Sequence, residues 1–222
     1  MSYMWNDFNI KTFPAETIVY RNGVYCPDLS TLENKPINQS YDLPVHIIYI
    51  GEISGENTLD ISVGEKNQNI VISANVKIKT SAILNILIKN AGESSKITGT
   101  VLLKNDGDLE YNCNAHHLYK KTGILIKTKL LACKKSKSKV SGIAVIDKDC
   151  DKCESDIALV AMTEPGAKID FMPGQRIKSE PIRADHSASI YEPTDAQIFY
   201  LRCAGLGTFE VQDALKEAFL SE

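Results

Sequence analysis

The chain has 222 residues, 43% of them hydrophobic and 24% charged, a balance typical of a globular protein that buries a full core. Its formal net charge of −3 argues against nucleic acid or a membrane surface as a partner. No apolar run approaches the roughly 20 residues that cross a bilayer, and Met1 to Lys11 lacks the pattern of a secretory signal, so we expect a cytoplasmic protein.

Residues 1–44 read as an irregular N-terminal segment that contains one hairpin. Two β-branched and aromatic stretches between Thr17 and Tyr25 flank the dipeptide Asn22-Gly23. Asn-Gly supplies the positive φ angles that a type I′ turn needs, so this pattern predicts a tight hairpin.

From about Val45 to about Ile190 the sequence reads as a succession of strands. Apolar and alternating runs, separated by Asn, Gly, Asp and Ser, occur at residues 45–50, 59–63, 70–79, 83–88, 97–103, 124–131 and 140–146. Helical periodicity is almost absent before Thr194, which excludes a doubly wound α/β fold. A sandwich, a barrel and a β-helix remain open, and strands rich in Lys, Ser and Thr with single aliphatic residues fit a solenoid.

After Pro193 the pattern becomes helical. Thr194 and Gln197 form a capping box, and glycines at 205 and 207 end the first predicted helix. Thr208 is the predicted cap of a second helix, whose apolar positions are Val211, Leu215, Ala218 and Phe219. This chain leaves part of the helical apolar surface uncovered, which indicates a surface for a partner.

The pair Asp185-His186 lies between small and β-branched residues. In a strand these neighbours point to opposite faces, so they do not form an ordinary acid–base pair. Both side chains are ligands for iron or zinc. Taken alone, the two residues fit a hydrogen-bonded histidine at the edge of a domain better than a metal site.

The six cysteines are expected to be reduced, because the chain is long and has no export signal. Cys150 and Cys153 have the CxxC spacing of half a zinc site or of a redox pair, and a turn with two incidental thiols explains them equally well. His116 and His117 are expected on opposite faces of a strand, one of them structural. The lysines around Cys133 read as a solvated strand edge.

Several catalytic motifs are absent from the sequence. It has no Gly-rich phosphate loop ending in Lys-Ser or Lys-Thr, so we expect it to bind no nucleotide itself. It also lacks a Gly-x-Ser-x-Gly elbow and a HExxH motif.

Two segments resemble the SufB/SufD family of iron–sulfur cluster assembly. The run Asp185-His186-Ser187-Ala188-Ser189, followed by Gln197-Ile198-Phe199-Tyr200-Leu201-Arg202, is similar to the closing signature of that family. The sequence departs from it at Cys203-Ala204, where the family usually has Ser-Arg. Residues 152–159 resemble the SufB segment with a cysteine essential for cluster assembly, which Cys153 matches. Residues 18–30 are more similar to SufD.

The resemblance implies a right-handed parallel β-helix with a short irregular N-terminal segment and a small C-terminal helical subdomain. We expect the N-terminal segment at residues 1–44, the β-helix core at 45–191 and an ATPase-docking segment at 192–222. The implied function is that of an assembly scaffold and not of an enzyme. A homodimer or a SufB/SufD-type heterodimer would hold a transient iron–sulfur cluster at its interface and bind a SufC-like ABC ATPase.

The resemblance also implies roles for single residues. Cys153 would accept sulfur or bind the cluster, and His186, supported by Asp185, would be a ligand at the interface. Cys133, His116 and Cys150 are weaker candidates for cluster or sulfur binding. The residues expected to contact the ATPase are Phe199, Tyr200, Arg202, Leu215 and Phe219. Two other functions remain open: a SufD-like accessory subunit that holds no cluster, and a solenoid or cupin-like metalloenzyme using His186, Asp185 and a cysteine or His116.

Overall fold

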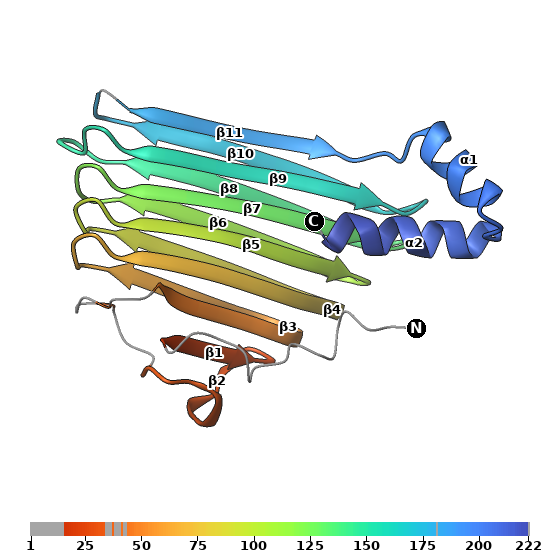
Figure 1. Cartoon of the computed structure of the whole chain (residues 1–222), viewed down its shortest axis with the longest axis horizontal. Helices are drawn as coiled ribbons and strands as arrows, with labels where there is room; N and C mark the ends of the chain where they lie inside the picture. The colour runs from red at the N-terminus through yellow and green to blue at the C-terminus, as the bar shows by residue number, and fades with distance from the viewer. Residues whose placement is uncertain (1–15, 34–36, 38–40, 42–43, 181, 222) are drawn as a thin grey trace.

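The computed structural model describes residues 16–33, 37, 41, 44–180 and 182–221. This part of the chain is a parallel β-helix followed by two α-helices (Figure 1). Its elements are β1 (Thr17–Arg21), β2 (Val24–Tyr25), β3 (Val45–Val63), β4 (Asn69–Asn90), β5 (Lys96–Asn105), β6 (Asp108–His117), β7 (Gly123–Ala132), β8 (Lys137–Ile146), β9 (Glu154–Thr163), β10 (Lys168–Ile177), β11 (Arg183–Ile190), α1 (Asp195–Cys203) and α2 (Thr208–Ser221). The predicted parallel β-helix is confirmed, in place of a sandwich or a barrel.

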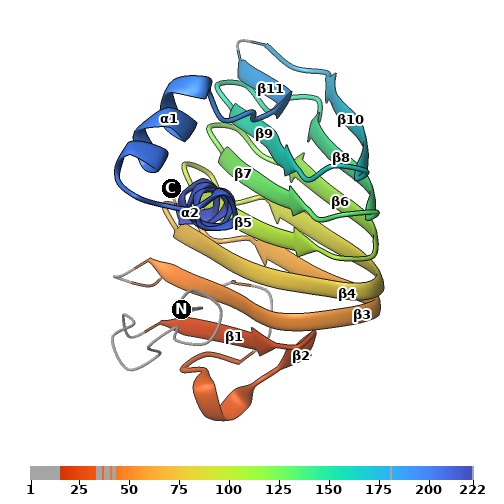
Figure 2. The same cartoon turned by 90° about the vertical axis from the view of Figure 1, so that its right-hand side faces the viewer.

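Two sheets face each other across the core and meet along the long strands β3 and β4 (Figure 2). The first half of β4 pairs with β5, and β7, β9 and β11 continue this first sheet. The second half of β4 pairs with β6, and β8 and β10 continue the second sheet. Successive strands of the chain therefore alternate between the sheets, and each pair of strands makes one coil of the solenoid.

The prediction of separate strands at 45–50 and 59–63, and at 70–79 and 83–88, is wrong, because β3 and β4 each run through the break. The pairing of β3 with β4 shifts register between Ile53 and Gly55, and Gly55 has a φ of 64°. An irregularity of this kind bends a strand without ending it. The polar break in the sequence therefore marks a corner of the coil and not a turn between two strands.

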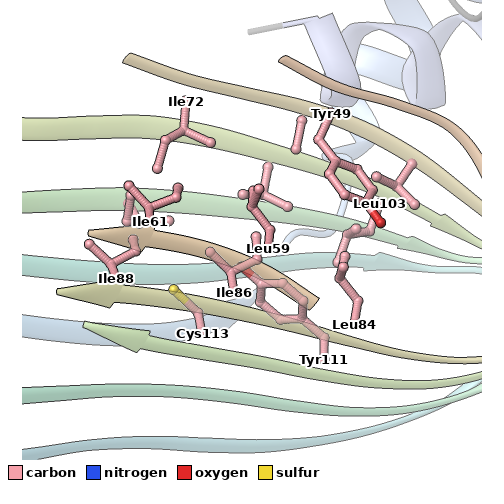
Figure 3. Packing of buried hydrophobic residues seen from close by; sticks show 14 of the residues in the cluster. Tyr49, Leu59, Ile61, Ile72, Leu84, Ile86, Ile88, Leu103, Tyr111 and Cys113 are labelled. Atoms are coloured by element: carbon pink, nitrogen blue, oxygen red, sulfur yellow. The ribbon is translucent and has the colours of Figure 1, made fainter. Parts of the chain in front are cut away.

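The core consists of inward-facing side chains stacked from coil to coil (Figure 3). Leu59, Ile86 and Cys113 form one such row, since β3, β4 and β6 are in register at these positions and all three side chains are buried. Full burial of one such aliphatic side chain contributes about 1.5–3 kcal/mol. The predicted runs did not include β6, because Asn112 and Asn114 on its outer face obscure its apolar alternation.

Buried asparagines tie the corners of successive coils together. The side-chain amide of Asn90 donates to the carbonyls of Ser95 (3.0 Å) and Gly123 (3.3 Å). One corner further along the chain, the amide of Asn105 donates to the carbonyl of Lys137 (3.0 Å). These bonds satisfy backbone groups that the parallel ladder leaves open at the turns.

The predicted N-terminal hairpin is confirmed. β1 pairs antiparallel with β2, and Asn22 and Gly23 have φ angles of 52° and 82°. β1 also pairs in parallel with β3. The N-terminal segment therefore adds a strand to the first coil.

The two predicted C-terminal helices are also present. The capping box of Thr194 and Gln197 begins α1, and Gly205 lies beyond its end with a φ of 91°. α2 begins at Thr208, so Gly207 and not Thr208 takes the cap position, and its N–H donates to the Glu210 carboxylate (2.7 Å).

α2 packs against the outer face of the first sheet. Its residues Val211, Leu215 and Phe219 are buried with Leu131 of β7 and Met162 of β9. The Lys129 ammonium donates to the carbonyl of Phe219 (2.7 Å), and Lys216 forms an ion pair with Glu164. Among the described residues, neither helix has the length and apolar character needed to cross a membrane.

Candidate functional site

Three turns lie one above another at the corner that holds Cys153. They are residues 118–122 between β6 and β7, residues 147–153 between β8 and β9, and the connection from β10 to β11. The Lys121 N–H donates to the carbonyl of Asp151, and the Arg183 N–H donates to the carbonyl of Cys153, both at 2.9 Å. Cys153 therefore lies one layer below the last coil.

The Cys153 thiol is buried, with 1% of the residue exposed. Its sulfur lies 3.2 Å from the carbonyl oxygen of Tyr119 and 3.2 Å from the hydroxyl oxygen of Thr122. The Thr122 oxygen in turn lies 2.8 Å from Nδ1 of His117. The sequence interpretation assigns Thr122 no role. One signal was available. The alternation along β6 directs the His117 side chain inward, and the turn that follows this strand ends at Thr122.

His117 contributes a buried imidazole ring to this corner. Its Nε2 is buried and has no hydrogen-bond partner. Burial lowers the pKa of His117 to about 4, so the imidazole is neutral at physiological pH. The prediction that His116 and His117 point to opposite faces is confirmed, since His117 is buried and His116 lies on the outer surface.

Cys150 lies in the same turn as Cys153. Its thiol contacts the carbonyl of His117 at 3.5 Å, and it packs with Cys153 and Ile146 beneath Ile182 and Ala184. Burial raises the pKa of the Cys150 thiol, and the nearby Cys153 acts in the same direction. The CxxC of the sequence is thus a pair of buried thiols in contact with the core.

Asp185 and His186 point to opposite faces of the edge strand β11, as predicted. His186 is in register with Ile157, which is buried in the core, so the histidine lies on the inner face of the last coil. No described strand follows there, and His186 is exposed. Asp185 lies on the outer face, 3.7 Å from Arg183.

Within one chain the structure does not bring Cys153 and His186 together. Arg183 is bonded to Cys153, and His186 lies three residues further along β11, which corresponds to roughly 10 Å. Among the described residues no three His, Cys, Asp or Glu side chains are grouped to hold a metal ion. A metalloenzyme site built from His186, Asp185 and either a cysteine or His116 would need these side chains together, but Asp185 and His186 point to opposite faces of β11.

The weaker candidates Cys133 and His116 lie elsewhere. His116 binds Asp147 at 2.8 Å on the outer surface, and the pKa of Asp147 is lowered by hydrogen bonds from Lys178 and His116. Cys133 follows the end of β7 and packs beneath α2, where burial raises the pKa of its thiol to about 12. It is separated from Cys153 by the length of a ten-residue strand, roughly 30 Å.

Comparison with known proteins agrees with this arrangement. The family model described as "SUF system FeS cluster assembly, SufBD core domain" matches residues 54–219. The chain belongs to the SufBD core family. No curated protein sequence matches it. Membership assigns the chain to iron–sulfur cluster assembly by the SUF system and confirms the resemblance read from the sequence.

The SufBD core match extends into α2, and the helices present an aromatic surface. Phe199, Tyr200 and Phe209 are 69%, 74% and 81% exposed, and Arg202 is exposed beside them. In contrast, Leu215 and Phe219 are buried against the first sheet, so they hold α2 in place and do not themselves form a surface. The sequence interpretation omitted Phe209, although it lies opposite the buried apolar positions of α2.

A hollow of about 500 Å³ lies between the helices and the ends of β7 and β9. Its lining includes Leu131, Met162, Ile198, Phe209 and Lys216. The helices lie at the end of the strands opposite the turn between β8 and β9, which contains Cys153 (Figure 1).

Proposed function

We propose that this SufBD core chain is a scaffold subunit that joins a second SufB/SufD-type chain through β10 and β11 and holds a nascent iron–sulfur cluster near that junction. The observation that carries the proposal is the uncovered last coil. In the described part of the chain β10 pairs only with β8, and β11 only with β9. Two neighbouring unpaired edges are an exposed template for further strand pairing.

The inner face of this open coil is partly apolar. Ile177 of β10 and Ile190 of β11 are 42% and 52% exposed, although their neighbours in the preceding coil, Ile146 and Ala161, are buried. A second chain placed on this end would bury these side chains together with the strand edges. We suggest a second copy of the chain as the simplest partner, because the same pair of edges is available on it.

The cluster would be cargo and not a resident cofactor. Thiolate and imidazole are ligands that iron–sulfur clusters accept, and Cys153 and His186 supply one of each close to the open end. Two chains would contribute two such sets. Asp185 is directed away from His186 and does not support it within the chain, so its contribution would be limited to the outer surface.

The aromatic surface of α1 and α2 is the proposed contact for a SufC-like ATPase. None of the residues of α1 is buried, yet the helix presents two aromatic rings, Phe199 and Tyr200, to solvent. Exposed aromatics of this kind often dominate the binding energy of an interface. Tyr200→Ala should weaken ATPase binding at least about tenfold. Tyr119→Ala, at the other end of the coils, is the control that should leave binding unchanged.

Anaerobic reconstitution with ferrous iron and sulfide tests the scaffold proposal. The wild type should develop a visible cluster chromophore, and Cys153→Ser and His186→Ala should each lose it. Cys203→Ser removes an exposed thiol and serves as the matched control that keeps the chromophore. If Cys153→Ser matches the wild type in iron and sulfide content, the site proposed here is wrong.

A second candidate is an accessory subunit that binds the ATPase and holds no cluster. The observation that supports this second candidate is the burial of Cys153, whose thiol is already hydrogen bonded. It predicts no chromophore in the wild type, together with ATPase binding that survives loss of Cys153 and His186 and fails when α1 and α2 are removed.

A further inference from the structure

Cys150 and Cys153 occupy the two ends of a single tight turn. Asp151 and Lys152 are its central residues, and Lys152 has a φ of 57°. The Cα atoms at the ends of a β-turn lie within about 7 Å of each other. A disulfide needs a Cα separation of about 4.4–6.8 Å, so the backbone of this turn permits one.

The turn also directs both thiols to the same place. Asp149 and Lys152, the residues directly before the two cysteines, both have left-handed backbone conformations, with φ of 64° and 57°. Such conformations cost about 1–3 kcal/mol each in residues other than glycine and often occur at functional sites. Cys150 and Cys153 lie in one buried cluster with Ile146, where they are 2% and 1% exposed. Burial raises the pKa of the Cys150 thiol, and Cys153 lies close enough to raise it further.

We propose that Cys150 and Cys153 form a dithiol that reduces sulfane sulfur to sulfide. This inference rests on the proposed function in cluster assembly, takes the sulfur-accepting role that the family resemblance implies for Cys153, and assigns Cys150 as the residue that resolves the Cys153 persulfide. The sulfur donor would be a small persulfide or polysulfide, because the buried thiols cannot be reached directly by a bulky group.

The reaction balances without an external oxidant. The Cys153 sulfur first attacks the terminal sulfur of the donor and forms a persulfide. The S–S bond of the donor breaks, and the shortened donor leaves as a thiol or shorter polysulfide with both electrons of that bond and the proton of the Cys153 thiol. The Cys150 sulfur then attacks Sγ of Cys153, the bond between Sγ and the outer sulfur breaks, and a disulfide between Cys150 and Cys153 forms. The outer sulfur takes both electrons of the broken bond and leaves as sulfide with the protons of the persulfide and the Cys150 thiol. A dithiol reductant restores the pair for another cycle.

Neighbouring groups support this assignment. Thr122 and the Tyr119 carbonyl contact the Cys153 sulfur, and the His117 carbonyl contacts the Cys150 sulfur, so both buried thiols have polar contacts. The unpartnered Nε2 of His117 is a buried acceptor or donor in the same corner. These contacts hold both sulfurs in one cluster, against which Ile182 and Ala184 pack.

The test uses reduced, full-length protein treated anaerobically with inorganic polysulfide and no added reductant. Cys26 and Cys203, which are not buried, are replaced by serine in every sample so that they do not react. Sulfide released after removal of excess polysulfide is measured, and the sulfur content of each cysteine peptide is determined by mass spectrometry after alkylation. Circular dichroism verifies that each variant is folded, and the buried Cys113 and Cys133 are internal controls.

The background protein should release about one sulfide per chain and gain a disulfide within the peptide that contains Cys150 and Cys153. Cys150→Ser should retain one added sulfur atom on Cys153 and release less than about a tenth as much sulfide. Retention of that sulfur in the background protein, with Cys150 still free, would overturn the dithiol inference but preserve Cys153 as sulfur acceptor. If Cys150→Ser gains no sulfur on Cys153, Cys153 is not a sulfur acceptor and the inference fails, whereas the proposed role of Cys153 as a cluster ligand is tested separately by the reconstitution.

Discussion

The hydroxyl of Thr122 and the thiol of Cys153 lie 3.2 Å apart, although 31 residues separate them in the sequence. The same hydroxyl meets His117, so it satisfies two buried groups from two coils. Thr122→Val keeps the shape of the side chain but leaves Nδ1 of His117 unpaired, and it should lower the free energy of unfolding by about 1–3 kcal/mol. Denaturant unfolding measures this loss. Thr122→Ser retains the hydroxyl, and equal losses in the two variants would contradict the role of the bond.

The depressed pKa of His117 predicts a stability that falls in mild acid. The unfolded histidine binds a proton below about pH 6.5, whereas the folded one does so only near its pKa of about 4. The contribution of neutral His117 to the free energy of unfolding is therefore fully present above about pH 6.5. About 3 kcal/mol of it is lost as the pH falls toward 4. His117→Asn should remove this part of the pH dependence, as measured by denaturant unfolding at several pH values. His116→Asn, on the outer surface, should retain it.

Phe219 and Phe209 lie on the same helix and form a matched pair for testing how α2 is held. Phe219 is buried, stacks on Tyr191 and accepts the Lys129 hydrogen bond through its carbonyl, whereas Phe209 is 81% exposed. Phe219→Ala should reduce stability by about 3 kcal/mol and increase proteolytic cleavage near α2. Phe209→Ala should change stability by less than about 0.5 kcal/mol. Similar behaviour of the two variants would show that α2 is not docked through Phe219.

Ala188 and Ser189 are exposed neighbours on opposite faces of β11. Ala188 faces the open end of the coil, where the second chain is proposed to bind. Ala188→Lys places a charge in that junction and should raise the dimer dissociation constant at least about tenfold, as seen by sedimentation. Ser189→Lys places the same charge on the outer face and should leave association unchanged. A wild-type chain that is monomeric at every concentration would refute the proposed junction.

The features predicted correctly from the sequence are those encoded by residues close together in the chain. The Asn22-Gly23 hairpin and the capping box at Thr194 each depend on a few consecutive residues, and both appear as expected. The polar breaks within β3 and β4 predict turns between strands but are corners within single strands, because the same polar residues and glycines occur in both. Only the pairing of the next coil decides between them, and pairing is not a local property.

In the candidate site, too, local features could be predicted from the sequence and contacts between coils could not. The alternation rule placed Asp185 and His186 on opposite faces without further information. It could not show that Cys153 is buried, nor that Thr122 and His117 surround it, because those contacts join turns from different coils. The family signature located residues by order along the chain and carried no information on the roughly 10 Å between Cys153 and His186.

The stacking of strands has a consequence for how the molecule opens. β4 is hydrogen bonded to β3, β5 and β6, whereas β10 and β11 each have a single neighbour. Because every coil contacts only adjacent coils, we expect unfolding to start at β11 and to proceed one coil at a time toward β4. Backbone amide protons should then exchange with solvent fastest in β10 and β11 and slowest in β4. A chain added at that end would turn the most labile strands of the monomer into the middle of a longer, continuous stack.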